Sequence, residues 1–206
     1  MDTRHRYPFD LVDVWHARNG ERVLIRPVHP QDLELAREFV RGLSPESRYN
    51  RFHHPLSELT PQMARWATHV DYERHLALIA VVYRDGREVE IGVARYVVSE
   101  RDPEAGEFAV AVADRWHGQG VASRLLRGLV DSAARKGLRW LEGDVLAENR
   151  AMLALARKLG FESRAPRRDA RIAKVSRRIH ARDASDASAP ASSGWKRFLG
   201  PLAASL

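Results

Sequence analysis

The chain has 206 residues, of which 44% are hydrophobic and 30% charged, and its formal net charge is +7. These values are typical of one globular domain with its own core. The absence of cysteine excludes disulfides, cysteine nucleophiles and thiolate metal sites, and favours a cytoplasmic location. No apolar run approaches the roughly 20 residues of a membrane span. We expect no secretory signal, because residues 1–6 lead into no apolar segment.

The first part of the chain predicts one strand followed by helices. We treat residues 1–20 as an N-terminal extension, and residues 21–28 predict a strand that ends at proline. A first helix is expected after residue 30. Ser44-Pro45 and Thr60-Pro61 then each suit an N-cap followed by a first helical position, so two further helices are predicted there.

The second part predicts a run of strands followed by alternating helices and strands. The predicted strands and helices are, in order, strands at 75–83, 89–98 and 106–113, a helix at 118–136, a strand at 140–146, a helix at 149–159, and strands at 161–163 and 170–178. Asp85-Gly86 is a hairpin turn signal between the first two strands. The order predicts a mixed α/β (α+β) domain over residues 21–180.

The C-terminal part differs in composition. Residues 181–206 are expected to form a flexible tail rich in serine and alanine. Between Arg164 and Arg182, eight basic residues stand against one acidic residue. This basic strip could attract phosphate groups or acidic proteins, or it could be a solvated face. Nucleic-acid binding is disfavoured, because no aromatic residues are interleaved with the basic ones.

The strongest local signal is a strand that runs through a glycine-bearing turn into a long helix, over residues 110–122. The first turn of a helix has backbone N–H groups without intrahelical partners, and the helix dipole adds positive charge. Glycines let a diphosphate approach that backbone closely. We therefore expect the N–H groups of Gly118, Gly120, Val121 and Ala122 to bind a diphosphate. The alternative is a plain glycine turn.

Here the sequence resembles the GNAT acetyltransferase family. Arg115-x-x-Gly118-x-Gly120 is similar to the family's first signature, and residues 149–161 are similar to its second motif. Further similarities, at residues 25–32, 43–52, 106–110 and 141–152, are to the acetyltransferase domain of bacterial Pat-type protein lysine acetyltransferases. The resemblance covers about residues 4–165. It implies the GNAT fold, a mostly antiparallel twisted sheet of about seven strands that is splayed at the cofactor site and flanked by helices.

The resemblance also implies acetyl-CoA as co-substrate. Together with the glycine turn, it assigns cofactor contacts to Val110, Val112, Arg115, His117, Gly118, Gln119, Gly120, Val121, Ala122 and Asn149. The backbone N–H near Val112 is expected to stabilise the oxyanion of the reaction. His117 could instead be an ordinary exposed loop residue, and Asn149 could only cap its helix.

Glu107 is the candidate catalytic base. An amine attacks a thioester only when it is neutral, so a base must take its proton. On the strand, Glu107 and the small alanines that follow it share one face, while Phe108, Val110 and Val112 share the other. The resemblance places the Pat-type base in the matching Glu-Phe-Ala motif; a solvated glutamate is the alternative. Ala156 stands where many GNAT enzymes have a tyrosine, so no general acid is assigned.

Three functions remain open at this stage. The main prediction is acetyl transfer to a protein lysine, because the helical segment 30–70 resembles the protein-directed Pat type. The second is a small-molecule amine acetyltransferase. The third is a non-catalytic module that senses acetyl-CoA, which the intact Glu107 disfavours. No metal is expected, because His53-His54 has no partner at metal-ligand spacing.

Overall fold

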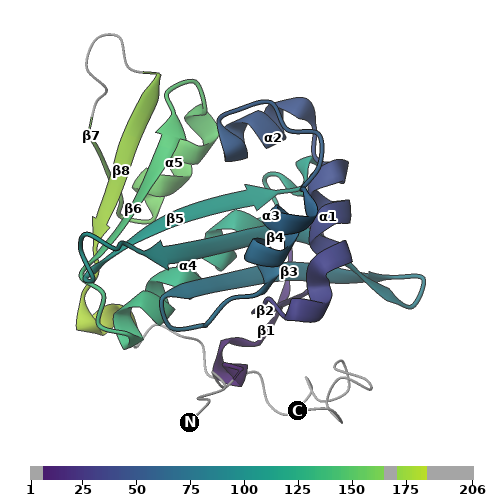
Figure 1. Ribbon diagram of the computed structural model, residues 1–206, viewed down its shortest axis with the longest axis horizontal. Coiled ribbons are helices and arrows are strands. Elements are labelled where there is room, and N and C mark those ends of the chain that lie inside the picture. The colour runs from purple at the N-terminus through teal and green to yellow at the C-terminus, as the bar shows by residue number, and fades with distance from the viewer. Residues whose placement is uncertain (1–6, 165–170, 185–206) are drawn as a thin grey trace.

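One open sheet forms the centre of the protein (Figure 1). The computed structural model describes residues 7–164 and 171–184. Within them, eight strands lie in the order β1-β2-β3-β4-β5-β6-β8-β7, and all neighbours are antiparallel except β5 and β6. The strands are β1 (Asp13–His16), β2 (Arg22–Pro27), β3 (His75–Arg84), β4 (Arg87–Val98), β5 (Ala105–Val112), β6 (Trp140–Leu146), β7 (Glu162–Arg164) and β8 (Ile172–Arg178).

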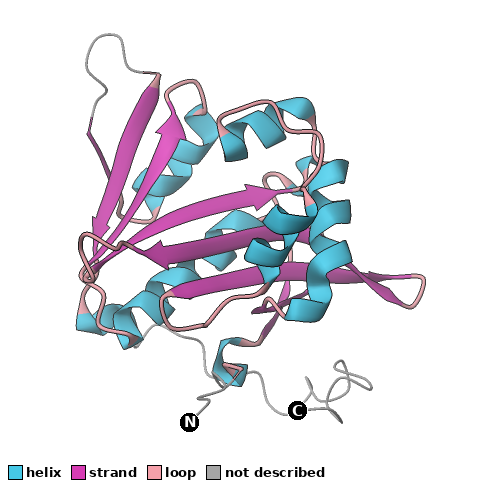
Figure 2. Ribbon diagram, in the orientation of Figure 1, coloured by secondary structure: helices cyan, strands magenta, loops and turns pink. Residues whose placement is uncertain are grey.

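Helices cover both faces of the sheet (Figure 2). They are α1 (Leu33–Gly42), α2 (Pro45–Phe52), α3 (Pro61–Thr68), α4 (Val121–Arg135) and α5 (Arg150–Lys158). The first three lie on one face, and α4 and α5 lie on the other. None of the helices in the described residues is long and apolar enough to cross a membrane. The sheet with helices on both faces confirms the predicted mixed α/β class.

The two faces of β5 enter two different cores. Phe108 and Val112 are buried in the large cluster that includes Leu125 of α4. Ala111, one position away from Val112, packs instead with the cluster around Phe39 of α1. This confirms the predicted alternation, with the large side chains of β5 toward α4 and the small ones toward α1–α3.

The predicted helix starts at the two Ser/Thr-Pro pairs are confirmed. The side chain of Ser44 accepts a hydrogen bond from Ser47 N at 3.1 Å, and α2 begins with the next residue. Thr60 accepts from Met63 N at 3.2 Å at the start of α3. Both caps satisfy N–H groups that a helix leaves without partners.

The sheet begins within the segment expected to be an N-terminal extension. β1 pairs with β2, with Asp13 opposite Ile25 and His16 opposite Arg22. Its addition accounts for a sheet of eight strands where about seven were expected. The sequence of β1 is only four residues long, so its pairing with β2, rather than a local pattern, identifies it as a strand.

The predicted tail starts with a short ordered element. The 3-10 helix η4 (Ala181–Ala184) is tied to β8 by an ion pair of 2.7 Å between Arg177 and Asp183. The rest of the tail, residues 185–206, and residues 165–170 of the basic strip lie outside the described residues.

Candidate active site

β5 and β6 separate toward the end of β5 that leads into α4 (Figure 1). They pair in parallel over three residues each, Ala105–Glu107 with Trp140–Glu142. Beyond these residues β6 continues beside β8, whereas β5 continues beside β4. The fold therefore has a splay between two central strands, and Glu107 stands where it begins.

Alternate residues of β5 direct their backbone N–H and C=O groups toward this splay. Ala113 N donates to Ile91 O, so odd-numbered residues of β5 are the ones hydrogen-bonded to β4. The backbone groups of Val110 and Val112 consequently point toward the splay. One of these groups, the carbonyl of Val112, has a partner, because Nε2 of His117 lies 2.9 Å from Val112 O. The imidazole of His117 is thus directed back onto the end of β5, and its contact with a phosphate stays a prediction.

The turn before α4 requires both of its glycines. Gly118 has φ of 73° and Gly120, the N-cap of α4, has φ of 93°, a region that disfavours other residues. A Cβ on Gly120 would also lie 3.2 Å from the ring of Trp15. Because α4 begins at Val121, the N–H groups of Val121 and Ala122 belong to its first turn and lie at the positive end of its dipole.

The N-terminal residues support this turn, which the sequence did not predict. Arg18 donates from its backbone N to Gln119 O at 3.2 Å and from Nη1 to Gly118 O at 3.1 Å. Arg124 of α4 forms an ion pair of 2.6 Å with Asp13 of β1. These contacts join residues at least a hundred positions apart, and no local motif signals them. Arg115 itself is exposed, in the 3-10 helix η3 (Asp114–Trp116).

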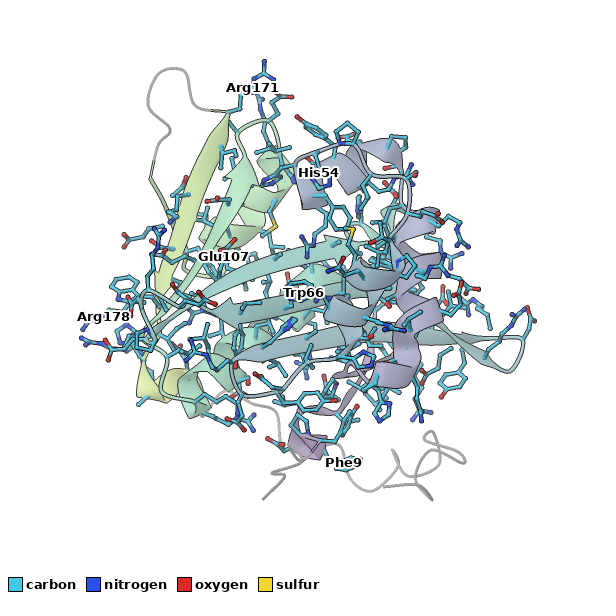
Figure 3. The ribbon with its side chains drawn as sticks, viewed as in Figure 1. Phe9, His54, Trp66, Glu107, Arg171 and Arg178 are labelled. Carbon is cyan, nitrogen blue, oxygen red and sulfur yellow. The ribbon has the colours of Figure 1, made fainter. Side chains whose placement is uncertain are left out.

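Glu107 is exposed on the face of the sheet that carries α1–α3 (Figure 3). It makes no hydrogen bond or ion pair with the described residues. Arg51 of α2 interacts with Glu107 electrostatically: burial lowers the pKa of Arg51, and the charge of Glu107 opposes that shift. The neighbouring carboxylate, Glu142 of β6, is opposite Glu107 in the parallel register and pairs with Lys174 at 3.3 Å. Glu107 is therefore the carboxylate of this pair that has no partner among the described residues.

The second motif has a confirmed structural role. The side chain of Asn149 accepts a hydrogen bond from Met152 N at 3.0 Å and caps α5. Ala156 is 2% exposed within the core, so this position contributes no proton donor. Within residues 7–164 and 171–184, no three His, Asp or Glu side chains are grouped so that they could hold a metal ion.

Asp114 joins the glycine turn to α2. Its carboxylate accepts hydrogen bonds from Ser44 N at 2.9 Å, Ser44 Oγ at 2.6 Å and Ser47 Oγ at 2.8 Å. Partial burial opposes ionisation, but the bonds from Ser44 and Ser47 outweigh it and lower the pKa of Asp114 to about 2. The helix that carries Arg51 is thereby fixed to the loop that precedes α4.

This link predicts a pH-dependent contribution to stability. The pKa of Asp114 falls from 3.8 to about 2 on folding, so its stabilisation is present above pH 3.8 and is lost as the pH falls through about 2. We expect Asp114→Asn to be less stable than the wild type at neutral pH, with a difference that shrinks across this window. Chemical unfolding at several pH values measures it. Asp144→Asn, at an exposed position of β6, is the control; a constant difference for Asp114→Asn would contradict the assignment.

Comparison with known proteins identifies the family of this chain. The sequence model of the acetyltransferase (GNAT) domain matches residues 22–162. The chain belongs to the GNAT acetyltransferase family. An acetyltransferase, PA5475, from Pseudomonas aeruginosa is 37% identical over 143 residues, which are 69% of this chain and 76% of that protein. The predicted family and enzyme class are thus confirmed, and GNAT acetyltransferases use acetyl-CoA as co-substrate.

Relatives of the Pat type are also similar to the chain. Acetyltransferase Pat from Mycolicibacterium smegmatis is 30% identical over 144 residues, which are 70% of this chain but 42% of that protein. The GNAT domain of PAT from S. lividans superposes with a TM-score of 0.76 at 25% identity, over 84% of this chain and all of that one. A GCN5-related N-acetyltransferase from Kribbella flavida, with a TM-score of 0.63 at 20% identity, covers 76% of this chain and 98% of that one and shows the shared fold.

Proposed function

We propose that this GNAT enzyme transfers acetyl from acetyl-CoA to the side-chain amine of a protein lysine, with Glu107 as the base. The observation that carries the proposal is the position of Glu107, exposed and without a partner among the described residues where β5 and β6 begin to separate. A lysine amine has a pKa of about 10.4, so a base must remove a proton before the amine can attack.

The other reactant is proposed to enter along β5. The diphosphate of CoA binds the N–H groups of the turn from Gly118 to Ala122, where α4 supplies the positive end of its dipole. The pantetheine arm then lies in the splay and pairs with the backbone of Val110. Negative charge develops on the thioester oxygen during attack, and the N–H of Val112 stabilises it. Arg115, His117, Gln119 and Asn149 are retained as cofactor contacts.

A protein acceptor is supported by the surface near Glu107. Helices α2 and α3 lie on the same face of the sheet as Glu107, and each exposes a large aromatic side chain. Tyr49 is 41% exposed and Trp66 is 54% exposed. Exposed aromatic residues are common anchors in protein interfaces. The similarity to Pat-type enzymes points in the same direction.

The basic strip gives less support than its sequence suggested. Arg171 and Arg178 lie at opposite ends of β8 (Figure 3). Arg177 is half-buried and paired with Asp183, and Lys174 is paired with Glu142. Its described part is therefore spread along a strand with some of its charge neutralised, and we retain only a contribution of its exposed residues to the recruitment of acidic proteins.

A comparison of cellular acetyl-lysine tests the proposal. Cells that express the wild type are compared by mass spectrometry with cells that express Glu107→Gln at the same level. We expect a set of lysines to be acetylated only with the wild type. If no lysine differs, and a polyamine or free amino acid is acetylated by the purified enzyme, the acceptor is a small amine. Binding of acetyl-CoA without any product would indicate the sensing module.

A further inference from the structure

Arg95 is a buried cation on the face of the sheet that carries Glu107. In the antiparallel pair of β4 and β5, Arg95 is opposite Ala109 and Val97 is opposite Glu107. Arg95 and Glu107 are therefore diagonal neighbours on one face, at a separation of roughly 7–8 Å along the sheet. Arg95 is only 7% exposed.

The immediate surroundings of Arg95 supply no negative charge. Its Nη1 lies 3.3 Å from Nε2 of His75, and its guanidinium lies 5.1 Å from the centre of the Trp66 ring. Burial, and then the charge of Arg95, lower the pKa of His75 to about 4, so this imidazole is neutral at pH 7. Arg95 Nε is buried without a partner, and no salt bridge among the described residues includes Arg95.

More distant ionisable groups form no ion pair with Arg95 either. Burial and then repulsion from Arg51 lower the pKa of Arg95 to about 9, so the guanidinium stays protonated at neutral pH. The charge of Glu90 opposes this lowering, but burial raises the pKa of Glu90 to about 8, and Glu90 and Arg95 form no ion pair. A buried cation without a counter-ion is unfavourable, and an anion from another molecule would relieve it.

We propose that Arg95 binds a carboxylate carried by the acceptor, close to the amine that Glu107 deprotonates. This inference rests on the proposed function, because it takes the face around Glu107 as the acceptor side. With Nη1 directed at His75, the edge formed by Nε and Nη2 remains for two carboxylate oxygens, the forked geometry in which arginine binds carboxylates strongly. The ring of Trp66 covers the guanidinium, so the proposal includes a turn of this exposed side chain when the acceptor binds.

The carboxylate has two chemical sources. It can be an acidic side chain beside the target lysine of a protein, or the α-carboxylate of a free amino acid. A polyamine has no carboxylate and would be repelled by Arg51 and Arg95. The inference thus restricts the acceptor to amines that carry a nearby negative charge.

The test compares acceptors that differ only in this carboxylate. The full chain receives acetyl-CoA with either of two single-lysine peptides, one with glutamate beside the lysine and one with glutamine there. A second pair consists of a free amino acid and its amide. We expect kcat/KM to be at least about tenfold higher for the acidic member of one pair, mainly through KM. The comparison uses the wild type, so it does not depend on the folding of a variant.

Variants then assign the preference to Arg95. In Arg95→Gln the ratio between acidic and neutral acceptors should fall to about 1, with the Kd for acetyl-CoA unchanged. Arg95→Lys keeps the charge but loses the fork, so its ratio should be intermediate. Arg87→Gln removes an exposed arginine at the other end of β4, the strand that carries Arg95, and should keep the wild-type ratio.

Each outcome decides a separate question. Equal kcat/KM within both pairs, or an unchanged ratio in Arg95→Gln, overturns the inference and leaves the proposed function intact. A preference for the amino acid over its amide, with neither peptide acetylated, supports the role of Arg95 and overturns the protein acceptor. Absence of product from all four acceptors overturns both.

Discussion

Replacing Glu107 with glutamine is expected to reduce kcat at neutral pH by about 100-fold or more, the usual contribution of a general base. Glutamine has a similar shape but cannot take the proton of the incoming ammonium. The affinity for acetyl-CoA should stay near the wild-type value, because the glycine turn lies at the other end of β5. The deficit should shrink as the pH approaches the pKa of a free lysine amine, about 10.4, where the acceptor loses its proton without help.

Glu142→Gln is the matched control for this prediction. The two glutamates are opposite each other in the register of β5 and β6, so they lie side by side on one face of the sheet and the substitution is the same. Glu142 is engaged with Lys174, whereas Glu107 has no partner among the described residues. We expect near wild-type turnover for Glu142→Gln. A loss in Glu142→Gln and a normal pH–rate profile in Glu107→Gln would assign the base to Glu142.

Gly120→Val is expected to weaken acetyl-CoA binding at least tenfold, or about 1.4 kcal/mol. Valine at φ of 93° is strained, and its Cβ would lie 3.2 Å from the ring of Trp15. To relieve the strain the backbone of the turn must change conformation, while the Trp15 ring or the turn shifts to relieve the contact, and we expect this change to displace the N–H groups at the start of α4. Calorimetric titration with acetyl-CoA measures the change.

Two glycines serve as controls for strain alone. Gly86 has φ of 80° in the turn between β3 and β4, with open space around it, so Gly86→Val carries the backbone strain far from α4. It should bind acetyl-CoA normally. Gly118 also has open space at a φ of 73°, so Gly118→Ala should have a smaller effect than Gly120→Val. Equal affinities for wild type and a folded Gly120→Val would place the diphosphate elsewhere.

The elements that could be predicted from sequence are those with local causes. Ser44 and Thr60 cap helices through bonds to residues three positions away, and Asn149 does the same for α5. The alternation of large and small residues in β5 is likewise local and identified its two faces before the sheet was known. The glycine turn could be predicted because its backbone conformation requires glycine, which is visible in the sequence.

Other features depend on contacts between distant residues. β1 is a strand because β2 lies beside it, and Trp15 matters because it packs on Gly120. The bonds from Ser44 to Asp114 span 70 positions. The sequence does not single out Arg95, and only its packing against His75 and Trp66 shows that it is buried without an ion pair. The local pattern of a single sequence does not predict contacts between residues so far apart in the chain.

The most direct test of the central claim is a paired assay of both products of the reaction. Purified wild type and Glu107→Gln are incubated with acetyl-CoA and a single-lysine peptide that has glutamate beside the lysine. Free CoA is measured by its thiol, and the peptide is measured by mass spectrometry. We predict that the wild type releases one CoA for each acetyl-lysine formed, and that Glu107→Gln binds acetyl-CoA equally well while forming almost no product. Equal rates of peptide acetylation by the two proteins would contradict the account.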